Sequence, residues 1–445
     1  MALSGLEIYK LLPKTNCKKC GFPTCLAFAM QLAAKKVALD KCPYVSEEAK
    51  KALDSASQPP IRLVTVGSGE EKIEIGNETV MYRHEDKFYH PTAIGFLVED
   101  DSKEADLKKA LGEIKKLDFE RVGQRIKVNL IALSNKSKDK TKFINALNII
   151  LKESELPLIL ASDNISTLEE ALKLSKDRKP IIYKATNANF KEIAGLSKSY
   201  KTTVAVSAPT MEELETLVKN IVNEGVQDIV LDTGGKNISD KIWDFTQMRR
   251  LALKKAFRPF GYPVVAFVKD ESPFQEAAIA SSYVAKYASI VVLNNSSPSN
   301  ILPILTLRQN LYTDPQKPLQ VEPKVYEVGN VNDRSPILIT TNFSLTYYTV
   351  ESEVESSKIP SYIVSCDAEG MSVLTAWAAE KFTPESIAKT LDKFSLKDKV
   401  KHKNIIIPGY VSVLSGKLEE ESGWKVTVGP REASGIPVFL RNLGK

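Results

Sequence analysis

The stretch TTVAVSAPTMEELETLVKNIVNEG, residues 202–225, decides the fold of most of this 445-residue chain. Its first seven residues form an apolar, β-branched run, which is typical of a strand covered on both faces of a parallel sheet. The remainder predicts a helix that begins after a cap at Thr210 and ends at Gly225. A strand followed by a helix is the building block of parallel α/β folds.

The same strand-then-helix pattern occurs eight times between residues 93 and 311. Eight such units over about 230 residues favour a (β/α)8 TIM barrel over an open sheet. The strand-like runs are AIGFLVE (93–99), IKVNLIAL (126–133), LPLILAS (156–162), PIIYKAT (180–186), TTVAVSA (202–208), QDIVLDT (227–233), YPVVAFVKD (262–270) and ASIVVLNN (288–295).

A proline-rich connection at residues 310–330 precedes a second α/β region, which we assign to residues 325–445. Strand-like runs at 335–342, 360–367, 403–409 and 424–430 alternate with helical stretches, so we expect a small doubly wound α/β domain. Ligands of such sheets bind beyond the carboxyl ends of the strands. Those ends are Thr340 and Thr341, Cys366–Gly370, Gly409 and Gly429–Ala433.

Four of the five cysteines lie near the start of the chain, with the spacing C-x2-C-x4-C-x16-C. Four thiolates suit an iron–sulfur cluster or a tetrahedral zinc ion. Structural zinc sites usually combine two C-x2-C pairs, and because only one is present we favour a 4Fe-4S cluster, with zinc as the alternative. Gly21 would let the loop wrap closely, and Lys18 and Lys19 would offset negative charge. The predicted ligands are Cys17, Cys20, Cys25 and Cys42.

These cysteines define a small helical domain at residues 1–58, with a helix expected from Leu26 to Leu39 and a further cap at Ser46 followed by Glu47 and Glu48. The sequence SASQPP at 55–60 reads as a linker, and residues 59–92 as a linker or extension. The fifth cysteine, Cys366, is expected to be a buried core residue.

The composition argues against a membrane protein, a secreted protein and a nucleic-acid-binding protein. The chain is 43% hydrophobic, has no apolar run near the roughly 20 residues that span a bilayer, and begins without a secretory signal. We therefore expect a cytoplasmic protein with no membrane contact. The net charge of +6 is spread over mixed Lys/Glu stretches without a basic, aromatic-rich stripe, which disfavours nucleic-acid binding.

Three segments together resemble one family: CKKCGFPTC near the start, and LITTNFSLTYYTVESE and CDAEGMSVLTAWAA in the last domain. They are similar to the large (gamma) subunit of the corrinoid/iron–sulfur protein of the reductive acetyl-CoA (Wood–Ljungdahl) pathway, and the resemblance covers all three domains in order. It implies a methyltransferase-type role as a methyl carrier, with the chemistry on a cobalt corrinoid and no catalytic side chain. The methyl group would come from methyltetrahydrofolate through a separate methyltransferase and pass to acetyl-CoA synthase. A smaller barrel-type subunit would complete a heterodimer.

The resemblance also implies a corrinoid-binding role for seven residues of the last domain. Each also has an ordinary structural explanation, such as a strand-end hydroxyl, a left-handed turn or a helix start. The seven residues are Thr340, Thr346, Gly370, Met371, Ser372, Val373 and Ala433.

No histidine is placed to ligate cobalt from below, because the Asp-x-His-x-x-Gly loop of many corrinoid proteins is absent. Of His84, His90 and His402 only the last lies in the C-terminal domain, where we expect it at the surface. Without a strong lower donor, reduction to Co(I) becomes easier. By the resemblance, the 4Fe-4S cluster would return one electron after each stray oxidation to Co(II).

Two other function classes remain open. One is a TIM-barrel methyltransferase that binds a pterin directly and carries a fused iron–sulfur electron donor. Asp232, Lys269 and Asp270 lie at barrel strand ends but form no acid–base pair with metal-ligand spacing, so we expect the barrel to be a scaffold. The other is a zinc-dependent interaction module, which only the cysteines and the basic charge favour.

Overall fold

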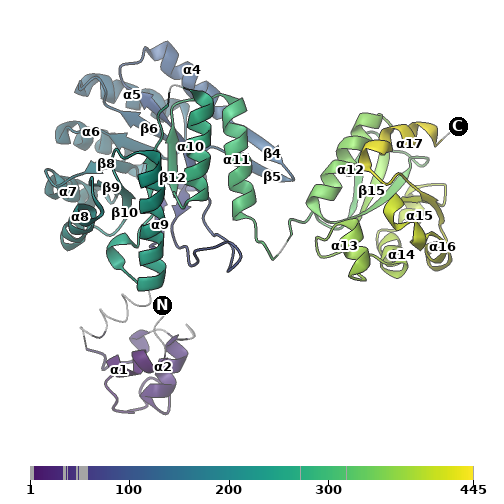
Figure 1. Ribbon diagram of the computed structural model, residues 1–445, viewed down its shortest axis with the longest axis horizontal. Helices are drawn as coiled ribbons and strands as arrows, with labels where there is room; N and C mark the ends of the chain where they lie inside the picture. Colours follow the sequence, from purple (N-terminus) through teal and green to yellow (C-terminus); the bar gives the residue numbers. More distant parts are fainter. Residues whose placement is uncertain are drawn as a thin grey trace. The chain divides into compact units, whose positions relative to one another are not determined.

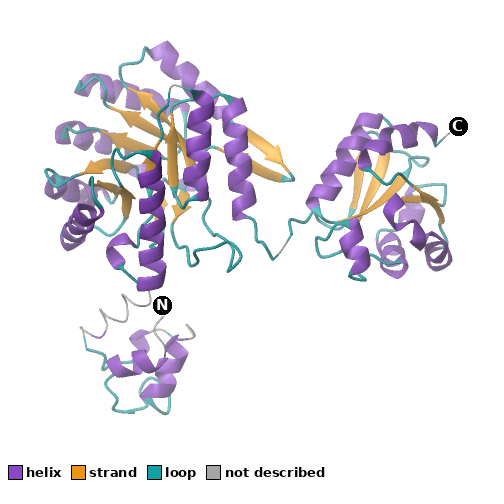
Figure 2. Ribbon diagram, in the orientation of Figure 1, coloured by secondary structure: helices purple, strands orange, loops and turns teal. Residues whose placement is uncertain are grey.

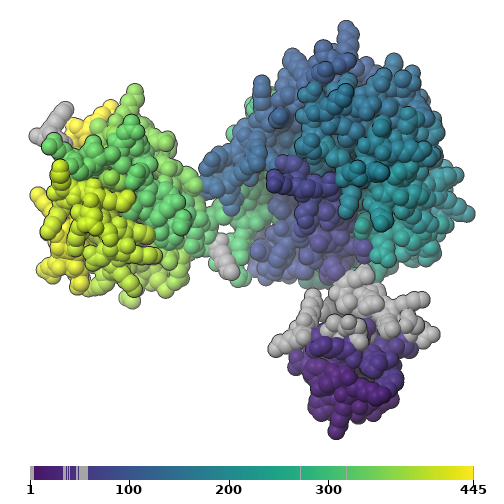
Figure 3. Space-filling model, turned by 180° about the vertical axis from the view of Figure 1, so that it is seen from behind, coloured from purple at the N-terminus to yellow at the C-terminus, as the bar shows by residue number. Residues whose placement is uncertain are grey.

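The computed structural model describes residues 5–33, 37, 39–46, 49, 59–270, 272–316 and 318–443. The chain divides into two compact units, Met1–Asp118 with Lys127–Tyr312, and Phe119–Ile126 with Thr313–Lys445 (Figure 1). Side chains fill the spaces that a ribbon leaves between the barrel helices, as the space-filling view in Figure 3 shows. Among the described residues, no helix combines the length and the apolar character needed to cross a lipid bilayer.

The cysteine-bearing segment contains two helices that pack on each other, α1 (Gly5–Leu11) and α2 (Cys25–Ala33), and a 3-10 turn, η1 (Leu39–Lys41). Helix α2 begins at Cys25, close to the predicted start, because side chains satisfy free N–H groups of its first turn. Asn16 Oδ1 accepts from the Cys25 N–H at 2.7 Å, and Thr24 Oγ1 accepts from the Ala27 N–H at 3.0 Å.

Several predicted features of this segment fall outside the described residues. These are residues 34–36 and 38 of the helix predicted from Leu26 to Leu39, the acidic pair Glu47 and Glu48, and residues 55–58 of the predicted linker. The predicted cap at Ser46 is present, since its Oγ accepts from the Ala49 N–H at 3.1 Å.

Eight parallel strands form the predicted barrel, in the order β10-β9-β8-β7-β6-β3-β12-β11. Figure 2 shows strands in orange and helices in purple. A bridge between Leu231 and Val264 joins the two ends of this order, and the Leu231 N–H donates to Pro263 O at 2.8 Å. The strands are β3 (Ala93–Glu99), β6 (Leu130–Ser134), β7 (Leu158–Ala161), β8 (Ile181–Ala185), β9 (Thr203–Ser207), β10 (Ile229–Asp232), β11 (Val265–Phe267) and β12 (Ile290–Leu293). The helices are α4 (Glu104–Lys115), α5 (Lys140–Glu153), α6 (Ile165–Ser175), α7 (Phe190–Tyr200), α8 (Met211–Asn223), α9 (Ile238–Lys255), α10 (Pro273–Ala285) and α11 (Pro298–Tyr312), with 3-10 turns η3 (Lys176–Arg178) and η4 (Arg258–Phe260).

The unit β9–α8 forms as predicted. Every residue of β9 is buried. Helix α8 begins after Thr210, whose side chain accepts from the Glu213 N–H at 3.2 Å, and Gly225 follows the helix with a φ of +89°. The apolar face of α8 is buried against the barrel, so the hydrophobic spacing and the cap chemistry specify the same structure.

The run predicted as one strand at 126–133 is instead divided, and this part of the prediction was wrong. Its first residues belong to a hairpin of β4 (Asp118–Arg121) and β5 (Gln124–Lys127), while β6 starts at Leu130. Val122 and Gly123 both have positive φ, at 52° and 66°, which is the geometry of a two-residue hairpin turn. The apolar pattern alone does not reveal such a turn, because Val rarely adopts positive φ.

The segment predicted as a linker or extension, residues 59–92, contains a two-stranded antiparallel hairpin, β1 (Val64–Val66) and β2 (Ile73–Ile75), with η2 (Gly69–Glu71) between the strands. Val64, Val66 and Ile75 pack in one core cluster with the interior side chains of the barrel. The hairpin therefore belongs to the barrel core.

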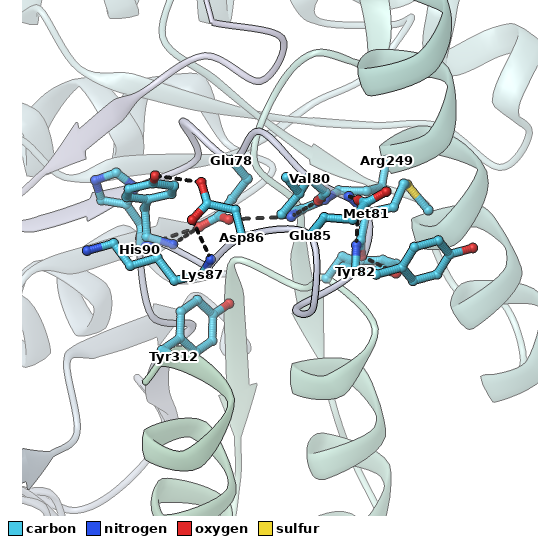
Figure 4. A network of polar contacts seen from close by, with 12 residues as sticks. Glu78, Val80, Met81, Tyr82, Glu85, Asp86, Lys87, His90, Arg249 and Tyr312 are labelled. Atoms are coloured by element: carbon cyan, nitrogen blue, oxygen red, sulfur yellow. Dashed lines mark hydrogen bonds and ion pairs between the residues drawn. The ribbon is translucent and has the colours of Figure 1, made fainter. Parts of the chain in front are cut away.

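The end of this segment is held by a network of polar contacts (Figure 4). Glu78 and Arg249 form an ion pair at 3.4 Å although they are only 5% and 7% exposed. Glu78 Oε1 accepts from the N–H groups of Tyr89 and His90, both at 2.9 Å. Arg249 donates to Val80 O at 2.6 and 3.0 Å, so both buried charges have hydrogen-bond partners.

The second unit has a five-stranded sheet in the order β13-β15-β14-β16-β17, parallel except for β13. The strands are β13 (Val325–Val328), β14 (Ile337–Thr341), β15 (Ser361–Cys366), β16 (Asn404–Ile407) and β17 (Lys425–Val428). The helices are α12 (Ser344–Ser357), α13 (Val373–Ala378), α14 (Pro384–Lys393), α15 (Leu396–Lys399), α16 (Ser415–Ser422) and α17 (Ile436–Asn442), with η5 (Gly409–Leu414) and η6 (Ala433–Gly435).

Separate apolar clusters cover the two faces of this sheet. Ile337 and Ile339 pack in a cluster that includes residues of α14 and α16, whereas Leu338 packs in one that includes residues of α12 and α17. Alternate residues of β14 thus serve opposite faces, as the predicted doubly wound arrangement requires. The sequence missed β13, which lies within the stretch that we interpreted as a proline-rich connection.

Candidate functional site

A hollow of about 380 Å³ lies at the carboxyl ends of β14 and β16. Strand β14 pairs with β15 on one side and with β16 on the other, so the strand order reverses at this point. Doubly wound sheets bind ligands at this reversal. The lining residues, which define the hollow, are Leu338, Ile339, Thr340, Leu345, Thr346, Thr349, Val350, Ser372, Val373, Leu374, Ile406, Ile407, Pro408, Tyr410, Gly429, Pro430, Arg431, Glu432, Ala433 and Ile436.

The structure brings five of the seven predicted site residues together in this hollow. They come from three separate parts of the sequence: the β14–α12 region, the start of α13, and the loop after β17. The five residues are Thr340, Thr346, Ser372, Val373 and Ala433.

Thr340 is the most enclosed polar side chain in this set, with 1% of its surface exposed. Its Oγ1 is buried and has no hydrogen-bond partner among the described residues. Buried hydroxyl groups nearly always have a partner, so an unpaired hydroxyl at the wall of a hollow suits a ligand that completes its hydrogen bonding. The neighbouring Thr341 also has an unpaired buried Oγ1, but it does not line the hollow.

Gly370 and Met371 do not line the hollow. Gly370 has a φ of +73° and occupies a tight turn, where an added Cβ would lie 2.6 Å from Gln320 Cγ. Met371 packs against the core of the domain. The turn is held by Asn342, a fully buried residue that we did not predict, whose Oδ1 accepts from the N–H groups of Ala368 at 2.9 Å and Gly370 at 3.0 Å.

The rim of the hollow contains residues that the sequence did not single out. Tyr410 donates to Glu432 Oε1 at 2.5 Å, and this hydrogen bond is the main reason that the pKa of Tyr410 is raised. Leu345 and Leu374, both exposed, add apolar surface to the rim. The strand-end rule identified the loop after β17. Thr346 of α12 was predicted from the family resemblance, whereas Leu345 and Thr349 of α12 and Tyr410 of η5 were not.

A Cβ on Gly409 would lie 2.7 Å from Gly429 O and 2.8 Å from Arg431 N. The Gly409 N–H also donates to Pro430 O at 3.0 Å. The loop between β16 and η5 thus approaches the loop after β17 so closely that the shape of the hollow depends on glycine at this position.

His402 lies before the amino end of β16, whereas the hollow lies beyond the carboxyl end of that strand. It is half-buried rather than at the surface as predicted, and its Nε2 lies 3.0 Å from Ser335 O. All three histidines fall in the described part of the chain, and none lines the hollow. The prediction for Cys366 is confirmed, since it is buried in the core and burial raises the pKa of its thiol to about 12.

The four N-terminal cysteines differ in exposure. Cys25 and Cys42 are buried in one small core and Cys20 packs against it, whereas Cys17 is exposed. The Lys19 backbone N–H is the main cause of the lowered pKa of Cys17. Gly21 has the expected positive φ, at +85°. Within the described ranges, no three His, Cys, Asp or Glu side chains are close enough to hold a metal ion, so the four-cysteine ligand set stays a prediction.

Comparisons with known proteins identify the relatives of this chain. Residues 63–440 match a family model described as CO dehydrogenase/acetyl-CoA synthase delta subunit, and residues 12–44 match one described as a putative Fe-S cluster. The corrinoid/iron-sulfur protein large subunit of Moorella thermoacetica is 50% identical over 441 residues, which are 99% of each chain. The acetyl-CoA decarbonylase/synthase complex subunit gamma of Methanothermobacter thermautotrophicus is 37% identical over 456 residues, covering 100% of this chain and 99% of that one.

Among solved structures, a dihydropteroate synthase from Thermus thermophilus is 13% identical and aligns with 57% of this chain and 100% of its own, at a TM-score of 0.39. A score of this size supports no functional conclusion.

Proposed function

The chain belongs to the family described as CO dehydrogenase/acetyl-CoA synthase delta subunit, together with the large subunits of corrinoid/iron–sulfur proteins, and we propose that it is a corrinoid-dependent methyl carrier of the acetyl-CoA pathway. In this role it accepts a methyl group from methyltetrahydrofolate through a methyltransferase and delivers it to acetyl-CoA synthase. The name of the Moorella relative supports the corrinoid and the iron–sulfur cluster.

The observation that carries this proposal is the hollow at the sheet reversal, lined by Thr340, Thr346, Ser372, Val373 and Ala433. Its wall is mostly apolar, with a few hydroxyl groups, which suits a flat macrocycle that has amide groups at its edge. When bound, the corrinoid would supply a cobalt ion that accepts and releases the methyl group. The lining side chains would keep water away from one face of the macrocycle, and the Thr340 hydroxyl would gain the hydrogen bond that it lacks.

The position of His402 supports the part of the proposal that concerns the lower side of the cobalt. This imidazole is at the opposite end of β16 from the hollow and is engaged with Ser335 O. The chain thus offers no imidazole at the hollow within its described residues. A cobalt without a strong lower donor is easier to reduce, which suits a carrier that must accept methyl groups repeatedly.

We further propose that Cys17, Cys20, Cys25 and Cys42 hold a 4Fe-4S cluster that reactivates the corrinoid by one-electron reduction. The match of residues 12–44 to the iron–sulfur family supports the cluster but not its type. The lowered pKa of Cys17 favours the thiolate form that a ligand needs.

The proposal is tested by the visible absorption spectrum of the protein purified without oxygen. Overlapping corrinoid and iron–sulfur bands are expected, and a colourless protein would refute both cofactors. Substituting Cys20→Ala should abolish reductive activation by external donors and leave corrinoid binding unchanged. If the variant is activated as fast as the parent, the cluster has another role.

The proposed partners are a smaller barrel-type subunit, the methyltransferase and acetyl-CoA synthase. We also propose that residues 1–58, 93–311 and 325–445 act as separate domains, so that the C-terminal domain can present its cofactor to several partners. Limited proteolysis should release a fragment close to 325–445. A chain that is cut first inside the barrel would contradict this division.

A further inference from the structure

The mouth of the barrel, at the carboxyl ends of its strands, contains polar side chains that the proposed function does not use. Asp232 ends β10 and is 3% exposed, and its Oδ2 accepts hydrogen bonds from the hydroxyls of Tyr183 and Ser207, both at 2.8 Å. Its Oδ1 accepts from the Gly234 N–H at 3.0 Å. Three donors from three different segments therefore fix the position of this carboxylate.

Lys241 lies in the first turns of α9, the helix that follows β10, and is 7% exposed. Its ammonium forms no hydrogen bond or ion pair with any residue that the structure describes. Burial lowers the pKa of Lys241, the charge of Asp232 opposes this shift, and the charge of Lys184 adds to it. Most of the Lys241 side chain is buried and its ammonium has no described partner, so its three donors are available to a ligand that accepts hydrogen bonds.

Thr233, which follows Asp232, gives a second indication. Its Oγ1 is buried and unpaired within the described chain, and the residue is almost fully enclosed. Thr233 directly follows the β10 residue Asp232, and Lys241 lies in the helix after β10, so both side chains without described partners come from the β10–α9 segment. The other polar groups nearby, Tyr183 and Ser207, are already engaged with Asp232.

Apolar side chains form a floor beneath these groups. Leu97, Tyr183 and Phe267 are only partly buried and lie on the interior cluster of the barrel. The rings of Tyr183 and Phe267 have centroids 4.6 Å apart and are tilted by 46°. Aromatic floors of this kind favour a flat ligand, since ring faces and edges pack with large contact area.

We propose that the mouth of the barrel binds a small flat heterocycle with an amide edge, whose C=O accepts from Lys241 and whose N–H donates to Asp232. A carboxylate has about four lone-pair sites, and three are used here, which leaves one for a ligand donor. An anion without a donor would be repelled by Asp232, and a cation would be repelled by Lys184 and Lys241. A neutral ring with one donor beside one acceptor satisfies both groups.

Ligand-observed NMR on the full chain tests this site, with uracil as the probe and 1,3-dimethyluracil as its matched control without N–H groups. Uracil is expected to bind saturably, and the dimethyl derivative is not. Lys241→Met and Asp232→Asn should each weaken uracil binding by about ten-fold or more, the loss expected for one charge-assisted hydrogen bond. The control Lys219→Met, on the exposed face of α8, should leave it unchanged.

A measurement of folding separates binding from stability. Because Lys241 has no described partner, Lys241→Met should unfold at the same urea concentration as the parent or at a higher one. The proposal is overturned if uracil does not bind the parent protein, if 1,3-dimethyluracil binds equally well, or if Lys241→Met binds uracil as tightly as the parent.

Discussion

Buried polar groups differ in their hydrogen bonding between two regions of the molecule: the Glu78–Arg249 network of the barrel unit and the hollow of the C-terminal domain. In the Glu78–Arg249 network, two buried charges bond to each other and to nearby backbone groups (Figure 4). At the hollow, the Thr340 hydroxyl is equally enclosed and has no partner in the described structure. Buried polar groups that bond to each other stabilise the fold, whereas a buried hydroxyl without a partner beside a hollow is available to bind a ligand.

The largest expected effect comes from opening the completed network. Arg249→Met leaves the Glu78 carboxylate buried without its cation, which should lower the free energy of unfolding by about 3–5 kcal/mol. Urea unfolding followed by circular dichroism measures this loss. The control Lys254→Met removes an exposed cation 3.6 Å from Glu85 and should lower the free energy of unfolding far less. If both variants lost the same free energy of unfolding, the Glu78–Arg249 network would stabilise the fold no more than an exposed ion pair does.

The second effect concerns the shape of the hollow. Gly409→Ala places a methyl group 2.7 Å from Gly429 O, so the loop after β17 must move. We expect a cost of about 1–3 kcal/mol in stability and a loss of about ten-fold or more in corrinoid affinity, measured by titration of the apoprotein. Gly416→Ala in α16 is the control, because nothing lies within 4 Å of the added methyl group. If both variants bind equally, the approach at Gly409 does not shape the site.

Some residues of the hollow could be predicted from the sequence and others could not. Thr340 lies at the carboxyl end of β14 and Ala433 lies in the segment after β17. Strand ends can be located from apolar runs, so the hollow was predictable to that extent. Asn342 was not singled out, although it follows the same strand, because only its contacts with the Ala368 and Gly370 N–H groups reveal its role.

The Glu78–Arg249 network could not be predicted from the sequence for a different reason. Glu78 and Arg249 are 171 residues apart in the chain, and each looks like an ordinary surface charge when its neighbours alone are considered. The hairpin β4–β5 was missed because its turn requires positive φ at Val122, a residue that does not signal one. Residue types and their spacing predict helices and strands. Contacts between residues far apart in the sequence, such as Glu78 and Arg249, become known only from the structure.

The third effect concerns the Thr340 hydroxyl, which we expect to contribute to ligand binding and not to stability. Thr340→Val keeps the shape of the side chain and removes an unpaired hydroxyl, so the stability of the apoprotein should stay the same or rise by up to about 1 kcal/mol. Corrinoid affinity should fall by about three- to ten-fold, because the hydrogen bond to the ligand is lost. Thr341→Val is the matched control, since its hydroxyl is also unpaired but lies outside the hollow. A loss of affinity in both variants would indicate a change in the strand and not a lost contact.

The smallest effect is expected for the exposed ion pair of Lys417 and Glu385, which differs from the Glu78–Arg249 pair in being open to solvent. Lys417 donates to Glu385 and, as the largest cause, lowers the pKa of this exposed carboxyl from 4.5 to about 2. A pKa that is lower in the folded state stabilises the fold above pH 4.5, and this contribution is lost as the pH falls toward about 2. The difference in unfolding midpoint between Glu385→Gln and the parent should therefore be small at neutral pH and vanish near pH 2. Lys417→Met should behave in the same way, because it removes the same pair. A difference that persists unchanged at the lowest pH would show that Glu385 stabilises α14 through its backbone contacts and not through its charge.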